Sequence, residues 1–169
     1  GWRIAGLPCE HLVLAVAPQH LASLLRERPA HAPLLQRIAG YAYEPIGTVY
    51  LAYPETVRLP FPMLGLQGPL GEWVFDRRPQ GGPAGLLACV LSAHGEWEGC
   101  DDETLATRLH QEIAAASTTF SGPLPAPRWS RVIRERRATF ACRPNLERPG
   151  TATAEPGLWL AGDHVCTDY

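Results

Sequence analysis

The order of the apolar segments along the chain constrains its fold most. A strand-like segment and two short helical segments come first, and they are followed by several strands, one longer helix and two further strands. This order is not the regular strand–helix alternation of a parallel α/β sheet. The strands are expected at residues 12–17, 46–53, 72–77, 86–93, 128–140 and 157–161. The sequence therefore predicts an α+β fold with a mixed, largely antiparallel sheet and flanking helices.

The local signals differ between the helices and the first strand. Asp101, Asp102 and Glu103 precede apolar residues at helical spacing, and acidic residues in a first turn are stabilised by the positive end of the helix dipole. We therefore expect the longer helix to begin there. The apolar run Leu12–Ala17 shows no alternation, which is typical of a strand covered on both faces. Pro18 suits the first position of a helix after that strand.

The composition excludes several classes of function. All fifteen basic side chains are arginines and the formal net charge is −2, so the chain lacks the basic surface with which a nucleic-acid-binding protein neutralises phosphates. No apolar run approaches the ~20 residues of a membrane span, and no basic segment followed by an apolar one marks a signal peptide. The five cysteines include no Cys-x-x-Cys pair, which indicates reduced thiols in a cytoplasmic protein.

The strongest site signal lies at the end of the last predicted strand, where Gly162 and Asp163 follow Leu158–Ala161. A residue without Cβ allows another group to approach the backbone closely, and ligands bind at the carboxyl ends of strands in α/β sheets. Asp163 could there accept hydrogen bonds from the hydroxyls of a sugar or sugar alcohol. A plain Gly-Asp turn accounts for the same two residues, and spacing alone favours the turn.

Other candidate sites have competing interpretations. The arginines within residues 128–137 could bind an anionic group, but a solvated strand face with surface ion pairs explains them better. No metal is expected, because the histidines and cysteines lack the spacing of a zinc site. Residues 54–71 hold four prolines and three glycines, which predicts loop or edge structure. The apolar side chains of Leu59–Leu70 fit either the wall of a lipid pocket or ordinary core.

Several motifs, taken in order, resemble those of flavin-containing amine oxidases and phytoene desaturases. The run Leu12–Pro18 resembles the strand and turn in the middle of these proteins. The closing motif Leu158–Asp163, with Thr167-Asp168-Tyr169, resembles their C-terminal FAD motif. Four further segments narrow the resemblance to the hydroxysqualene dehydroxylases, or squalene-associated FAD-dependent desaturases: Tyr43–Leu51, Arg58–Met63, Trp73–Arg77 and Arg131–Phe140.

The resemblance implies an FAD cofactor and three regions of the chain. Residues 1–28 would be a strand and helix of the FAD domain, residues 29–148 the substrate-binding domain, and residues 149–169 the remainder of the FAD motif. Gly162 and Asp163 are then the expected FAD contacts, which reverses the preference for a plain turn.

The implied reaction is the reductive dehydroxylation of hydroxysqualene to squalene in hopanoid biosynthesis. The protein would supply an apolar tunnel for this long isoprenoid, with Phe61, Met63 and Leu64 among its lining residues. The catalytic residues are not identified. By residue type alone, the candidates for an acid or base are Asp76, His94 and Glu96. Two alternatives stay open, namely a carotenoid-desaturating or amine-oxidising relative and a flavin-free lipid-binding or interaction module.

We expect the chain to be a piece of a longer protein. It begins with Gly1, its only methionine is Met63, and it lacks the Gly-x-Gly-x-x-Gly segment that holds the ADP half of FAD in the family. FAD is accordingly expected in the full-length parent and not in this chain, which we expect to be inactive by itself. Surface left exposed by the missing FAD domain is expected to drive homodimer formation, and peripheral membrane contact is a further expectation.

Overall fold

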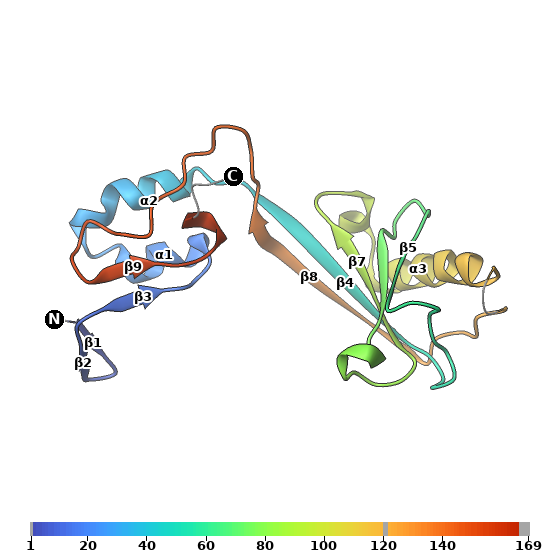
Figure 1. Ribbon diagram of the computed structural model, residues 1–169. Coiled ribbons are helices and arrows are strands. Elements are labelled where there is room, and N and C mark those ends of the chain that lie inside the picture. The colour runs from blue at the N-terminus through green and yellow to red at the C-terminus, as the bar shows by residue number, and fades with distance from the viewer. Residues whose placement is uncertain (1, 120–121, 166–169) are drawn as a thin grey trace. The chain divides into compact units, whose positions relative to one another are not determined.

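The chain forms two compact units in the computed structural model, which describes residues 2–119 and 122–165 (Figure 1). Unit 1 combines residues 1–42 with residues 140–169, and unit 2 consists of residues 43–139. The domain boundaries expected after residues 28 and 148 both fall inside unit 1. Which unit contacts FAD and which contacts substrate stays a prediction.

Unit 1 opens with a hairpin that the sequence analysis did not predict. Strands β1 (Trp2–Ile4) and β2 (Leu7–Cys9) pair antiparallel. The two turn residues Ala5 and Gly6 have φ of 48° and 85°, the left-handed conformation that a tight two-residue hairpin turn requires at both positions. Because alanine rarely adopts this conformation, the dipeptide gives a weak turn signal in the sequence.

The remainder of unit 1 pairs the first predicted strand with the last. Strand β3 (Leu12–Leu14) lies parallel to β9 (Leu158–Leu160). Helices α1 (Pro18–Leu25) and α2 (Ala32–Ala39) follow β3, with a short 3₁₀ turn at Pro29–His31 between them. Pro18 is the first residue of α1, as predicted.

The prediction that the first strand is covered on both faces was wrong. Val13 is 57% exposed and Trp159, its partner on β9, is also exposed, whereas Leu158 and Leu160 are buried. The sheet has two strands, and alternate side chains of a strand point to opposite faces. The apolar run therefore has one buried and one exposed face.

Unit 2 is built on a five-stranded sheet with strand order β5-β6-β7-β4-β8. Its strands are β4 (Tyr43–Ala52), β5 (Met63–Gly65), β6 (Trp73–Asp76), β7 (Leu86–Ser92) and β8 (Trp129–Phe140). From β5 to β4 every neighbouring pair is antiparallel. Short 3₁₀ turns lie at Arg78–Gln80 and Glu96–Gly99. The predicted α+β fold is confirmed, and β5, an edge strand of the sheet, lies inside the segment that was predicted to be loop or edge structure.

Helix α3 (Asp102–Ser117) packs on one side of this sheet (Figure 1). Asp101 caps its N-terminus, because the Asp101 side chain accepts a hydrogen bond of 2.8 Å from the backbone N–H of Thr104. Such a cap satisfies one of the free N–H groups of a first turn. The helix therefore begins where the acidic residues predicted it.

We define the covered face of the sheet as the side that packs against α3. The sheet contributes fully buried side chains to it, and α3 adds the apolar stripe of one helix face. The sheet residues are Val49, Leu51, Val74, Leu87, Cys89 and Leu91, and the helix residues are Leu105, Leu109 and Ile113. This face holds the hydrophobic core of unit 2.

We define the open face as the opposite side of the same strands. In its central row Tyr50 pairs with Ala88, Ala88 with Phe75, and Phe75 with Met63. The next row joins Thr48, Val90, Trp73 and Gly65 in the same way. The single α-helix described in unit 2 lies on the other side of the sheet. The open face is thus apolar without being packed by α3.

Candidate functional site

The closing motif places a carboxylate at the end of a parallel strand pair. The backbone of β9 is fixed to β3 through the bonds from Leu12 N to Gly157 O at 2.7 Å and from Ala161 N to Leu14 O at 3.0 Å. Asp163 is the third residue after the end of β9, and its side chain is 67% exposed. Its carboxylate is therefore accessible at the carboxyl ends of two parallel strands, where α/β sheets bind ligands. Residues 167–169 of the same motif lie outside the described residues.

Gly162 has a local reason to be glycine. Its φ of +136° is unfavourable for other residues, and a Cβ at this position would lie 2.9 Å from Nδ1 of His164. The imidazole ring of His164 thus occupies the space that a side chain would need. That Gly162 also admits a cofactor stays a prediction, since the packing of His164 already explains the residue.

His164 is buried directly behind Asp163. Burial lowers the pKa of the His164 imidazole, and the nearby Asp163 carboxylate has a smaller effect in the opposite direction. The two side chains are 3.9 Å apart between Nδ1 and Oδ1, and Nε2 of His164 has no hydrogen-bond partner among the described residues. The ring is therefore neutral near pH 7. The guanidinium of Arg148 lies beside Asp163 and donates to its backbone oxygen at 3.2 Å.

The three predicted substrate residues do not share one surface. Phe61 precedes β5 and is 65% exposed, and Met63 is 47% exposed on the open face. Leu64, the next residue on β5, points to the opposite side and packs against the hydrophobic core. Adjacent residues of a strand face opposite sides of its sheet, so a single wall of a substrate site contains Met63 or Leu64 but not both.

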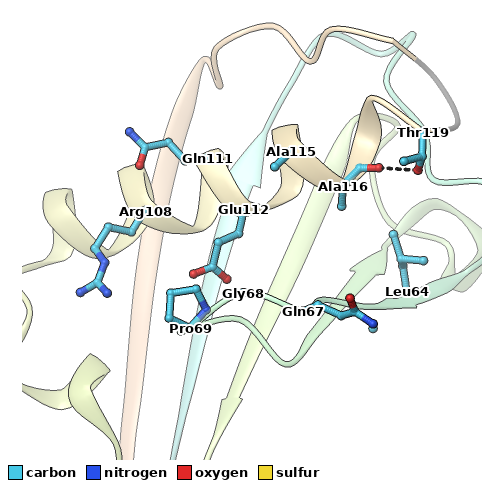
Figure 2. A pocket seen from close by; sticks show the side chains of 11 residues that line it. Leu64, Gln67, Gly68, Pro69, Arg108, Gln111, Glu112, Ala115, Ala116 and Thr119 are labelled. Atoms are coloured by element: carbon cyan, nitrogen blue, oxygen red, sulfur yellow. Dashed lines mark hydrogen bonds between the residues drawn. The ribbon is translucent and has the colours of Figure 1, made fainter.

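Leu64 instead borders a pocket of about 650 Å³ within unit 2. The pocket lies between α3 and the segment that follows β5, as Figure 2 shows. Glu112 points from α3 towards Gly68 and Pro69. Its carboxylate accepts hydrogen bonds from Leu70 N at 3.0 Å and Gly71 N at 2.7 Å. Glu112 therefore fastens a loop to the helix, and its hydrogen bonds to the loop leave it poorly suited to act as a general base.

The open face carries no charged side chain at any paired position from β5 across to β4. Trp73 is 44% exposed there, and Ile133 on the neighbouring strand β8 is also exposed. Three hydroxyl groups interrupt this apolar surface, those of Thr48 and Tyr50 on β4 and that of Ser92 at the end of β7. The sequence analysis did not single out any of these residues. Alternation along residues 46–53 was visible, but alternation alone does not tell which side of a strand meets the core.

The three candidate acids and bases have structural partners. Asp76 is buried on the covered side, where it accepts hydrogen bonds from Leu59 N, Arg78 N and the Arg78 guanidinium. Glu96 is exposed, and its Oε2 lies 3.7 Å from the guanidinium nitrogen Nη2 of Arg108. None of these interactions places a carboxylate on the open face.

His94, the third candidate, belongs to a surface cluster. Its Nδ1 lies 3.0 Å from Glu98 Oε1, and its Nε2 lies 4.0 Å from Glu44 Oε2. These carboxylates raise the pKa of the His94 imidazole, and the hydrogen bond with Glu98 has the largest effect. The cluster is exposed, so it forms a solvated charge network.

The arginine-rich strand β8 is tied to the start of α3. The guanidinium of Arg134 donates to the Asp102 carboxylate and, at 2.8 Å, to the backbone oxygen of Cys100. This agrees with the interpretation of these arginines as ion-pair partners on a strand face. Across residues 2–119 and 122–165, no helix is both long and apolar enough to span a bilayer.

The fold and sequence together define a class of protein. The model of the flavin-containing amine oxidoreductase family matches residues 3–169, and the chain belongs to this family. Its members are FAD-dependent oxidoreductases. A solved oxidoreductase from Methanosarcina mazei shares the fold, with a TM-score of 0.55 at 14% identity over 93% of this chain and 38% of that one.

Two curated relatives are more similar to the chain in sequence than this solved structure is. The chain is 32% identical over 162 residues to hydroxysqualene dehydroxylase from Rhodopseudomonas palustris, which covers 95% of this chain and 34% of the relative. It is 30% identical over 167 residues to hydroxysqualene dehydroxylase from Sinorhizobium fredii, covering 98% of this chain and 35% of the relative. The chain therefore spans about a third of the length of these relatives.

The residues of unit 1 fit one kind of contact with the family's cofactor. An accessible carboxylate at Asp163 suits the hydroxyl groups of FAD, because an ionised carboxylate only accepts hydrogen bonds. It does not suit the phosphates, which carry the same sign of charge. A contact of Asp163 with FAD would thus involve the sugar or ribityl part of the cofactor.

Proposed function

We propose that this chain provides the substrate-binding wall of an FAD-dependent oxidoreductase that acts on a long-chain isoprenoid, and that the reaction is the reductive dehydroxylation of hydroxysqualene to squalene. The single observation that carries the proposal is the open face. A sheet that already has a core on one side does not need a second apolar side in order to fold, and exposed apolar patches mark binding surfaces.

The chemistry of the open face favours a hydrocarbon over the alternative substrates of the family. Its paired positions are uncharged, so a neutral chain can lie against Met63, Phe75 and Trp73 without leaving a charge unpaired. An amine substrate is cationic near pH 7, and the paired positions from β5 across to β4 offer it no carboxylate. The identity of about 31% to two hydroxysqualene dehydroxylases supports the same choice.

The reaction replaces a C–O bond with a C–H bond and releases water, which consumes two electrons and two protons. When bound, FAD supplies the two-electron chemistry. The residues of the open face would hold the chain of the isoprenoid and keep water away from it. Asp163 would hold hydroxyl groups of the cofactor.

Ligand binding to the isolated chain tests the first part of the proposal. Squalene delivered in cyclodextrin should quench tryptophan fluorescence, and Trp73→Phe should remove most of this change because Trp73 lies on the open face. Trp159→Phe is the matched control, since it removes an exposed tryptophan of unit 1. Absence of any response in the unsubstituted chain would contradict the proposal.

Product analysis tests the reaction itself. A longer protein that contains this chain would be incubated with FAD and a reductant, and then offered hydroxysqualene, phytoene or an amine. Formation of squalene from hydroxysqualene is the expected result. Turnover of phytoene or of an amine in its place would assign the protein to one of the other branches of the family.

A further inference from the structure

We propose that the Tyr50 hydroxyl, assisted by Thr48, is the hydrogen-bonding point that positions the hydroxyl group of the substrate on the open face. This inference rests on the proposed function, because it assigns part of the surface that would bind the isoprenoid. It makes Tyr50 a positioning and specificity-determining residue, one that distinguishes a hydroxylated chain from a plain hydrocarbon.

The first argument is where the two hydroxyls lie. Thr48 and Tyr50 are two residues apart on β4, so they share a face of the sheet. Directly across from them on β7 are Val90 and Ala88, and the rows continue into the apolar side chains of β6 and β5. They are therefore the polar positions within the two rows that make up the centre of this face.

The second argument is that both hydroxyls are free to bind. Tyr50 and Thr48 are half-buried, and within the described part of the chain neither side chain makes a hydrogen bond. By contrast, the hydroxyl of Tyr53, at the end of the covered side, lies 3.1 Å from His110 Nδ1. A hydroxyl that ends up under a bound hydrocarbon without a partner would lose its hydrogen bonds to water, which is unfavourable. A substrate hydroxyl removes that penalty, and a hydrocarbon does not.

The third argument is that the apolar surface continues beyond Tyr50. Ala88 lies opposite Tyr50, is the smallest side chain of the central row and is only 3% exposed. Phe75 and Met63 continue from Ala88 towards β5, so a chain whose hydroxyl meets Tyr50 can extend along apolar side chains.

The test compares two ligands that differ in the hydroxyl, namely hydroxysqualene and squalene. For the unsubstituted chain we expect tighter binding of hydroxysqualene, measured by tryptophan fluorescence. Tyr50→Phe should weaken hydroxysqualene binding by about 3- to 10-fold, the range for one net hydrogen bond, and leave squalene binding unchanged. Thr48→Val should act in the same direction with a smaller effect. Phe75→Leu is the matched control, and it should weaken both ligands to the same extent.

The outcomes separate this inference from the proposed function. If both ligands bind and neither Tyr50→Phe nor Thr48→Val changes the ratio of the two dissociation constants, the inference is wrong and the proposed function stands. If neither ligand binds the unsubstituted chain, both are wrong. Because Tyr50→Phe breaks no hydrogen bond within the described structure, the variant should fold normally, and its circular dichroism spectrum checks this.

Discussion

The two faces of the sheet in unit 2 are built from similar residues but differ in how deeply these residues are buried. Leu87 on β7 is fully buried in the core beneath α3, whereas its neighbour Leu86 points to the open face and is only half-buried. The covered face has the packing that gives a domain its stability. The open face has apolar side chains that contribute less to stability. The proposed function assigns this second set of apolar residues to binding.

The largest expected effect follows from truncating the same side chain on each face. Leu87→Ala removes a fully buried side chain and leaves a cavity, so it should lower the free energy of unfolding by about 2–5 kcal/mol. Leu86→Ala removes a half-exposed side chain next to it, and the loss should be about 1 kcal/mol. Urea denaturation followed by circular dichroism measures both values. Equal losses would show that the open face is packed as tightly as the covered one.

A medium effect is expected where the loop after β5 is attached to α3. Glu112→Ala leaves the backbone N–H groups of Leu70 and Gly71 without their acceptor. Unsatisfied buried donors are costly, so we expect a loss of about 1–3 kcal/mol in the free energy of unfolding. Gln111→Ala, which alters the exposed neighbour on the same helix, serves as the control and should have little effect. A loss no larger than that of the control would mean that the loop does not depend on Glu112.

The covered face was largely predictable from the sequence. Acidic residues at its start and apolar residues at helical spacing predicted α3. Apolar, β-type segments predicted β4, β6 and β7. The segment of the short strand β5 was predicted only as loop or edge structure, because prolines and glycines surround the strand. The hairpin of β1 and β2 was missed because its turn contains an alanine with positive φ, which local preferences do not predict.

The candidate sites were less predictable, for a physical reason. Strand periodicity separates two sets of side chains but does not tell which set meets a helix. Met63 and Leu64 were therefore predicted as one site although β5 sends them to opposite faces. Gly162 was prominent in the sequence, but its contact with the His164 ring depends on a buried side chain two residues later. Such contacts emerge only from the three-dimensional arrangement.

The smallest expected effect concerns the pH dependence of the helix that makes the two faces different. Hydrogen bonds from the Thr104 backbone N–H and, secondarily, from its hydroxyl lower the pKa of the Asp101 carboxyl below its usual value of 3.8. A lowered pKa in the folded state means that the ionised form is stabilised by folding. This contribution is complete above pH 3.8 and is lost as the pH falls through the lower value of the folded state.

Asp101→Asn tests this, because asparagine also caps helices but does not titrate. The unfolding midpoint of the unsubstituted chain should decline relative to that of the variant only below pH 3.8, and the difference should be constant between pH 5 and 7. Direct titration of the Asp101 carboxyl carbon by NMR gives the same pKa independently. A pKa of Asp101 at or above 3.8 in this NMR titration would show that the cap of α3 is not formed in solution. The helix that covers one face would then start later in the chain, and the contrast between the faces would be smaller than the structure indicates.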